Sequence, residues 1–114
     1  MDRLVVQPCT KPLSGSVRVS GMTKNAGLKQ MAASLMARGK STLTNMNSVA
    51  DLSIMCELLE SIGAKVVKEN DNTYSIDSST DLIPEAPYEL VSKMRASINV
   101  LSPLLATVGS AKVS

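Results

Sequence analysis

Three residues with side chains suited to binding an anion stand at the starts of two predicted helices. Lys24 and Asn25 follow a turn that begins at Gly21, and Arg95 precedes a long apolar stretch. The first turn of a helix carries positive partial charge, so a lysine there costs roughly 0.3–1 kcal/mol. A bound anion would offset that cost, because free backbone N–H groups and an ammonium together hold a phosphate or carboxylate. The pattern therefore indicates an anion site.

Each of these residues also has a purely structural explanation. Lys24 could be a solvated lysine beside a turn, and Asn25 could cap its helix. Arg95 could pair with Glu89 or Glu85 on the surface, which contributes under about 1 kcal/mol. Both readings stay open at this level. Three further basic residues, Lys29, Arg38 and Lys93, are predicted to be solvated, although Lys93 is close to Arg95 in the sequence.

The two helix starts belong to an internal similarity with a spacing of 70 residues, the separation of Gly39 and Gly109. Each copy has a polar or basic helix start, an apolar helix, a glycine and a segment typical of a strand. Such repetition is a fold signal, with chance similarity between apolar helices as the competing explanation. The coinciding positions are Asn25 and Arg95, Leu28 and Ile98, Met31 and Leu101, Leu35 and Leu105, and Leu43 and Val113.

Hydrophobic periodicity predicts the elements that must position these residues. Residues 16–77 follow the order β-α-β-α-β-β, and a long helix follows them. We expect strands at 4–7, 17–20, 41–45, 64–68 and 73–77, helices at 25–38, 49–62 and 88–108, a hairpin turn at 69–72, and a further strand at 112–114.

Several local features of these helices can be predicted as well. Gly39 and Gly63 should end the first two helices, and Ser48 should cap the second. Pro103 removes a backbone donor, so it should kink the third. Residues 98–105 are apolar on nearly every side, which is typical of a helix buried in a core.

The composition bounds the class of protein. At 114 residues the chain is one domain at most, and with 2% aromatic residues its core must be aliphatic. There are 12 basic and 10 acidic residues and no basic stripe, which argues against nucleic-acid binding. The longest apolar run, 100–108, is too short and broken to span a membrane. Without a leader peptide, we expect a cytoplasmic protein.

Metal and disulfide chemistry have little support in the sequence. The chain has two cysteines, Cys9 and Cys56, and no histidine. A zinc site is therefore not expected, and no other metal or cofactor is predicted. We expect both thiols to remain free, with Cys56 packed as a small hydrophobe on a helix.

Five segments together resemble the bacterial UDP-N-acetylglucosamine enolpyruvyl transferases. The Met-Arg-Ala-Ser-Ile run after Ala-Pro-Tyr is the most specific of them, and the resemblance covers essentially the whole chain but only about the first quarter of a typical member. The segments are Ser20-Gly21, Lys24-Asn25-Ala26, the run 59–66, the run 86–91 and the run 94–98.

The resemblance implies a fold, a reaction and site residues. The fold is an inside-out α/β barrel of repeated βαβαββ units. The reaction moves the enolpyruvyl group of phosphoenolpyruvate onto the 3′-hydroxyl of UDP-N-acetylglucosamine, which opens peptidoglycan synthesis and so serves cell-wall biogenesis, cell shape and cell division. Carried over by position, Lys24 and Asn25 contact phosphoenolpyruvate and sugar, and Arg95 contacts the UDP-sugar and its phosphates. A planar guanidinium suits bidentate phosphate contacts.

The chain departs from the family pattern in two ways. The family usually has one residue between the glycine and the lysine, whereas Met22 and Thr23 both stand there. The family's catalytic loop, Pro-Gly-Gly followed by cysteine or aspartate, would come after Ser114, so no catalytic acid is predicted within this chain. Alternatives are the related shikimate-pathway enolpyruvyl transferase, which typically has serine where Asn25 stands, and a non-catalytic repeat or interaction module.

These points predict a partial barrel. We expect residues 1–15 to be an N-terminal strand and turn contributing to the second lobe, 16–77 to be the first βαβαββ unit, and 78–114 to begin the next unit. We expect the chain alone to be inactive and to self-associate through its apolar helix.

Overall fold

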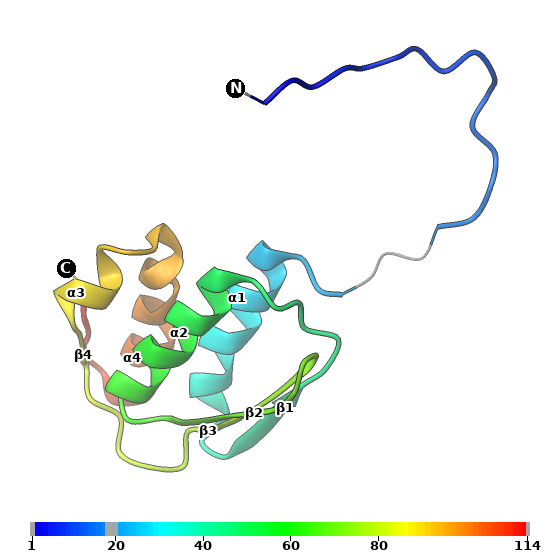
Figure 1. Cartoon of the computed structure of the whole chain (residues 1–114). Helices are drawn as coiled ribbons and strands as arrows, with labels where there is room; N and C mark the ends of the chain where they lie inside the picture. The colour runs from blue at the N-terminus through cyan, green and yellow to red at the C-terminus, as the bar shows by residue number, and fades with distance from the viewer. Residues whose placement is uncertain (1, 18–20, 114) are drawn as a thin grey trace.

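The computed structural model describes residues 2–17 and 21–113 of the chain. Residues 2–17 run as an extended segment that projects away from the rest, whereas residues 21–113 build a layer of helices on one face of a small sheet (Figure 1). The strand predicted at 17–20 falls largely on residues 18–20, which lie outside the described residues.

The strand predicted at residues 4–7 is wrong. The segment has no strand conformation, and Leu4, Val5 and Val6 are 90%, 65% and 82% exposed. An extended segment becomes a strand only when a neighbour satisfies its backbone hydrogen bonds. Within the described part of the chain no strand pairs with it.

The first predicted helix is present as two consecutive pieces. The α-helix α1 spans Lys24–Ala33, and the 3₁₀ helix η1 follows over Ser34–Ala37. Thr23 is the N-cap, because its Oγ1 accepts a hydrogen bond from the N–H of Ala26 at 3.3 Å. Asn25 therefore does not cap the helix. The helical segment ends at Arg38, which has a φ of +49°. This is one residue before Gly39, where the sequence predicted the end.

The second helix, α2, spans Ala50–Ser61 and matches the prediction. Its buried residues Leu52, Met55, Leu58 and Leu59 form the expected stripe. The cap predicted at Ser48 is wrong, because the N-cap position falls on Val49, whose side chain cannot accept a hydrogen bond.

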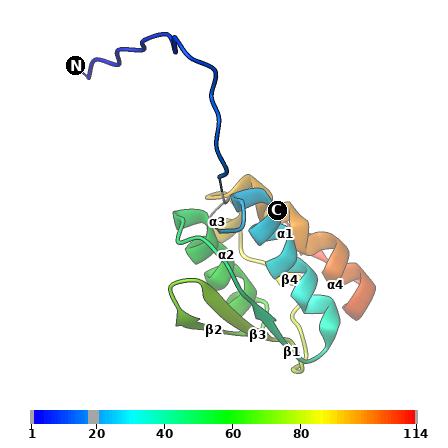
Figure 2. The same ribbon diagram turned by 90° about the vertical axis from the view of Figure 1, so that its right-hand side faces the viewer.

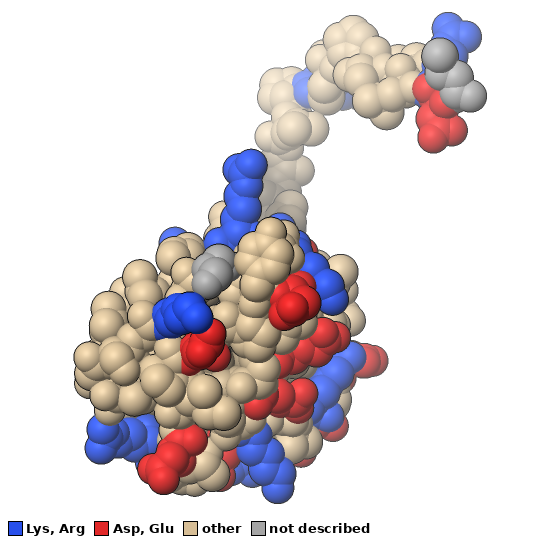
Figure 3. All heavy atoms as spheres, turned by 90° about the vertical axis from the view of Figure 1, so that its left-hand side faces the viewer, with Lys and Arg blue, Asp and Glu red and all other residues tan. Residues whose placement is uncertain are grey.

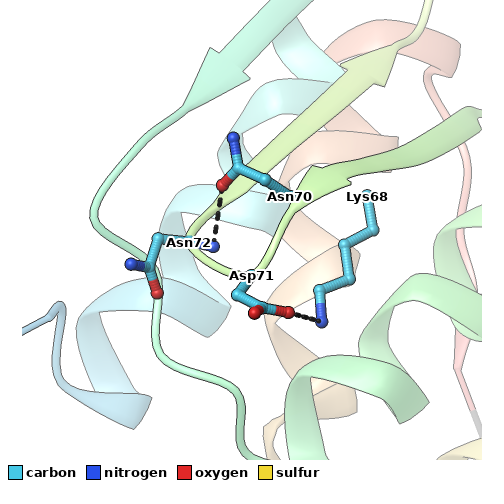
Figure 4. Close-up of polar contacts among 4 residues, drawn as sticks. All are labelled: Lys68, Asn70, Asp71 and Asn72. Atoms are coloured by element: carbon cyan, nitrogen blue, oxygen red, sulfur yellow. Dashed lines mark hydrogen bonds and ion pairs between the residues drawn. The ribbon is translucent and has the colours of Figure 1, made fainter.

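The two helices lie on a three-stranded antiparallel sheet of order β1-β3-β2. Its strands are β1 at Lys40–Leu43, β2 at Lys65–Asn70 and β3 at Thr73–Asp77. The predicted hairpin between β2 and β3 is confirmed. The side chain of Asn70 accepts a hydrogen bond from the N–H of Asn72 at 2.9 Å, and Lys68 Nζ lies 3.3 Å from Asp71 Oδ1 (Figure 4).

The single kinked helix predicted for residues 88–108 is wrong. The structure has three short helices there: α3 at Tyr88–Val91, the 3₁₀ helix η2 at Arg95–Val100 and α4 at Leu101–Val108. The break comes at Met94, whose backbone is extended. Pro103 is the third residue of α4, a first-turn position that proline tolerates.

The end of the chain forms a second, smaller sheet. Strand β4 at Glu85–Ala86 pairs in parallel with β5 at Lys112–Val113, beside α3 (Figure 1). The pairing confirms strand conformation at the predicted place. Lys112 Nζ also donates a hydrogen bond of 2.7 Å to Glu85 Oε1 across it.

An aliphatic core joins the helices to β3, as the composition predicted. Its largest fully buried side chains are Leu28, Met31, Leu35, Met46, Leu52, Met55, Leu58, Leu59, Ile62, Ile76, Val100 and Leu104. Residues 98–105 are only partly in this core, contrary to expectation. Leu104 is buried, but Ile98 and Leu105 are 54% and 49% exposed, so η2 and α4 present an outer apolar face. Helix α4 lies at the outer edge of the helical layer (Figure 2).

Candidate functional site

The three predicted anion-binding residues line one pocket. Lys24, Asn25 and Arg95 share a partly open cavity of about 340 Å³ at the N-terminal ends of α1 and η2. These residues come from segments 70 positions apart, and the packing of α1 against η2 brings them together. The cavity is also lined by Asp51, Lys93, Met94 and Ala96.

Lys24 is held at the start of α1 and pairs with a carboxylate. Its ammonium forms an ion pair with Asp51, which lies in the first turn of α2. Asp51 favours that position because the helix N-terminus is positively polarised. The Lys24 side chain is 55% exposed and that of Asp51 27%, so the ammonium keeps access to a ligand while paired.

The segment before η2 directs Arg95 toward the pocket. The backbone of Met94 is extended, with a φ of −149°, and its buried side chain anchors the turn in the core. The buried hydroxyl of Ser97 donates a hydrogen bond of 2.7 Å to the carbonyl of Met94. Arg95 follows as the first residue of η2 and is exposed, which leaves its guanidinium free to contact an anion.

Positive charge exceeds negative charge at this pocket. Lys24, Lys93 and Arg95 face one carboxylate, that of Asp51. Figure 3 shows acidic and basic side chains interspersed on the face that it draws. The positive excess at the pocket suits an anionic ligand such as a phosphate ester, which guanidinium and ammonium groups both bind.

Sequence reasoning did not assign Asp51 and Lys93 to the site. From the sequence, Asp51 is recognisable only as an acidic residue in the first turn of a helix, where it is favourable. Nothing in the sequence indicates that α2 begins beside α1. Lys93 was predicted to be solvated. It is exposed and lines the pocket, and its position two residues before Arg95 was the available signal.

The two cysteines lie outside this pocket and are both free, as predicted. Cys9 is exposed in the N-terminal segment, and Cys56 is half-buried on α2. Burial, with a contribution from the nearby Glu60 carboxylate, raises the pKa of Cys56 to about 11. A thiol with that pKa stays protonated at neutral pH and is a poor nucleophile.

Comparison with known proteins identifies the family. The profile of EPSP synthase (3-phosphoshikimate 1-carboxyvinyltransferase) matches residues 8–114. The chain belongs to this family.

Relatives within the family carry the name that the sequence predicted. The chain is 45% identical over 114 residues to the UDP-N-acetylglucosamine 1-carboxyvinyltransferase of Trichlorobacter lovleyi, covering all of this chain and 26% of that protein. The protein of the same name from Chloroherpeton thalassium is 50% identical over 115 residues, again covering all of this chain and 26% of that protein. The chain thus spans about a quarter of the length of the curated relatives it matches.

A solved structure confirms the predicted α/β class of the fold. The structure of the enolpyruvyl transferase NikO from Streptomyces tendae is similar with a TM-score of 0.68 and 27% sequence identity, covering 84% of this chain and 22% of that one. Among the described residues, no helix has the length and apolar character that crossing a membrane requires.

Proposed function

We propose that this chain is the N-terminal part of an enolpyruvyl transferase that moves the enolpyruvyl group of phosphoenolpyruvate to the 3′-hydroxyl of UDP-N-acetylglucosamine. The observation that carries the proposal is the pocket that gathers Lys24, Asn25 and Arg95, the residues that the family resemblance indicated. Both substrates would carry phosphate, and the positive excess at the pocket fits them. The names of the full-length relatives support the choice of reaction.

Each of the three side chains has a role in this proposal. Lys24 supplies a compact positive charge for the phosphate or carboxylate of phosphoenolpyruvate. Asn25 offers an amide that can donate to and accept from the sugar. Arg95 supplies a planar guanidinium for the phosphates of the UDP-sugar. Asn25 also favours this substrate over phosphoshikimate, because the shikimate enzymes typically have serine there.

The chain provides one wall of the proposed site and no proposed catalytic acid. The proton donor and the second lobe that closes over the substrates would come from the remaining three quarters of a full-length enzyme, in which this chain forms part of the inside-out barrel. Without a general acid and water exclusion the reaction has no efficient path. We therefore propose that residues 1–114 alone release no phosphate from phosphoenolpyruvate.

The cellular setting follows from the proposed reaction. The product would enter peptidoglycan synthesis and so contribute to cell-wall biogenesis, cell shape and division. Two free thiols, Cys9 and Cys56, fit the reducing cytoplasm, where disulfides are rare. We also propose that the isolated chain associates with a second copy through the outer apolar face of η2 and α4.

A chimera tests the proposed reaction. Residues 1–114 would replace the matching first quarter of the Trichlorobacter lovleyi relative, and phosphate release would be measured with phosphoenolpyruvate and UDP-N-acetylglucosamine. We expect turnover from the chimera and none from the 114-residue chain. Because a chimera can also fail by misassembly, a titration of the 114-residue chain with UDP-N-acetylglucosamine, followed by amide NMR shifts, accompanies it. Shifts confined to residues outside the pocket, together with an inactive chimera, would refute the proposal.

A further inference from the structure

We propose that Asn47 is a positioning residue for Lys24. Its amide fastens the turn before α1 to the loop before α2, and this fixes where the Lys24 ammonium enters the pocket. The inference rests on the proposed function, since it assigns Lys24 to a ligand site. It concerns a loop of this chain that none of the sequence motifs marked.

The turn before α1 is held by hydrogen bonds to both backbone groups of Met22, its N–H and its carbonyl. The N–H of Met22 donates a hydrogen bond of 2.6 Å to the carbonyl of Asn45. The carbonyl of Met22 accepts one of 2.9 Å from Nδ2 of Asn47. These two bonds form a latch between the turn at residues 21–23 and the loop at residues 45–47. Asn45 takes a φ of +59° within that loop, a conformation that asparagine tolerates better than most residues.

Gly21 is required for the latch to close. Its φ is +75°, which glycine adopts at little cost. A Cβ at this position would lie 1.7 Å from Oδ1 of Asn47. Any side chain at residue 21 would therefore push the Asn47 amide away from the Met22 carbonyl.

The loop that carries the latch is itself anchored in the core. Met46 is fully buried, and its N–H donates a hydrogen bond of 2.8 Å to the carbonyl of Asn72 in the hairpin. Its Cε would lie 3.2 Å from a Cβ at Gly27 of α1, so Met46 packs closely against that helix. The latch thus ties the turn to a fixed part of the molecule.

The same stretch of chain fixes both ends of Lys24. Asn47 holds the turn that leads into the lysine backbone, and Asp51, four residues later, pairs with its ammonium. Thr23, which stands between Met22 and Lys24 in the sequence, is the N-cap of α1. The latch also accounts for the added residue in the turn, because it binds Met22 and leaves Lys24 as the first residue of the helix.

Two variants and one matched control test this inference in the 114-residue chain. Asn47→Ala removes the donor, and Gly21→Ala displaces the same amide. Thr80→Val is the control, because the Thr80 hydroxyl also makes one hydrogen bond to a distant backbone carbonyl, that of Gly63 at 2.7 Å, outside the pocket. If Gly21→Ala fails to fold, Asn47→Ala carries the test.

Two readouts follow the latch and the lysine separately. Hydrogen exchange of the Met22 amide should accelerate by about tenfold in both variants, the effect of one net hydrogen bond. Acylation of the Lys24 amine, measured by mass spectrometry relative to Lys29, should change by roughly two- to fivefold, the range of an exposed ion pair. The control should change neither. An unchanged Lys24 acylation rate in Asn47→Ala would overturn the inference, as would unchanged exchange at Met22.

A titration with inorganic phosphate separates this inference from the proposed function. In the unmodified chain, phosphate should shift the amide resonances of Lys24 and Arg95. Asn47→Ala should weaken phosphate binding about threefold, which is a smaller effect than the loss of a charged contact. If phosphate shifts neither residue in the unmodified chain, the proposed anion site fails, while exchange and acylation still decide the latch. If phosphate binds equally well to Asn47→Ala, positioning by Asn47 is refuted.

Discussion

At the scale of single residues, Lys24 is paired with a carboxylate and still accessible to a ligand. Its ammonium contacts Asp51 while more than half of the side chain stays exposed. An ion pair at such a site contributes about 0–1 kcal/mol to stability, so the pair contributes little to the fold. In the proposed site the pair would orient the ammonium before a ligand binds, which lowers the entropy lost on binding.

The contribution of Arg95 to substrate binding should depend on the planar shape of its guanidinium as well as on its positive charge. In the chimeric enzyme, Arg95→Ala should raise the KM for the UDP-sugar by about tenfold or more, because a charge-assisted hydrogen bond is lost. Arg95→Lys should recover only part of that loss, since an ammonium cannot make a planar bidentate contact. Lys29→Ala, an exposed substitution on α1 outside the pocket, is the control. An unchanged KM in Arg95→Ala would remove this residue from the site.

Cys56 should show a pH dependence set by its raised pKa of about 11. Only the thiolate reacts with iodoacetamide, and the raised pKa keeps Cys56 protonated through neutral pH. Its alkylation rate should therefore rise about tenfold per pH unit between pH 7 and 10. The exposed Cys9 serves as the internal comparison in the same digest, and circular dichroism checks that the chain stays folded. A Cys56 rate that levels off below pH 9 would contradict the prediction.

At the scale of elements, the 70-residue similarity reappears as element order and not as burial. Helical residues followed by a strand occur in both copies, as α1-η1-β1 and as η2-α4-β5. The corresponding apolar positions differ in environment. Leu28 and Leu35 are 1% and 0% exposed, whereas Ile98 and Leu105 are 54% and 49% exposed. In the first copy, α2 and the sheet cover the apolar residues. In the second copy, the described residues cover the helices on one side only.

Adjacent leucines of α4 should therefore differ in their contribution to stability. Leu104 is fully buried, so Leu104→Ala should lower the free energy of unfolding by about 2–5 kcal/mol through lost burial and a cavity. Leu105 is half-exposed, and Leu105→Ala should cost less than about 1 kcal/mol. Urea unfolding of the two variants measures the difference. Equal losses would mean that α4 is buried on both sides, as the sequence pattern first suggested.

At the scale of the whole molecule, the apolar surface is unevenly distributed. Apart from those of the N-terminal segment and single residues elsewhere, exposed apolar side chains lie on η1, η2 and α4, and η1 and η2 both pack against α4. Exposed apolar side chains gathered on neighbouring elements are typical of an interaction site. The exposed residues of the outer apolar face of η2 and α4 are Ile98, Leu105 and Val108, and Met36 on the neighbouring η1 is exposed as well.

We expect the 114-residue chain to form a dimer or higher oligomer through this outer face. The double substitution Ile98→Lys and Leu105→Lys should shift it to a monomer, because burying two lysines at an interface is unfavourable. Sedimentation velocity measures the change. Ile83→Lys provides the comparison, since Ile83 is 53% exposed in the loop before β4. A monodisperse monomer for the unmodified chain would refute the association.

Local sequence patterns predicted most of the elements and the residue types of the candidate site. Periodicity identified α2 and the β2-β3 hairpin, and both are confirmed. The aliphatic core follows from a composition with 2% aromatic residues. The choice of Lys24, Asn25 and Arg95 as candidates required only their residue types at helix starts and the family resemblance. Element types and helix starts depend on neighbours within a few positions of the chain, so they can be predicted from the sequence.

Tertiary packing decided what those patterns could not express. Asp51 and Lys93 join the pocket because α1, α2 and η2 converge there, and Asn47 reaches Met22 across 25 positions. Packing also divided residues 88–108 into three helices and left Leu105 outside while Leu104 went inside. A sequence records which residues are apolar or charged, but which face is covered depends on elements far away in the chain. That is why three residues of the candidate site could be predicted and the other residues that line its pocket could not.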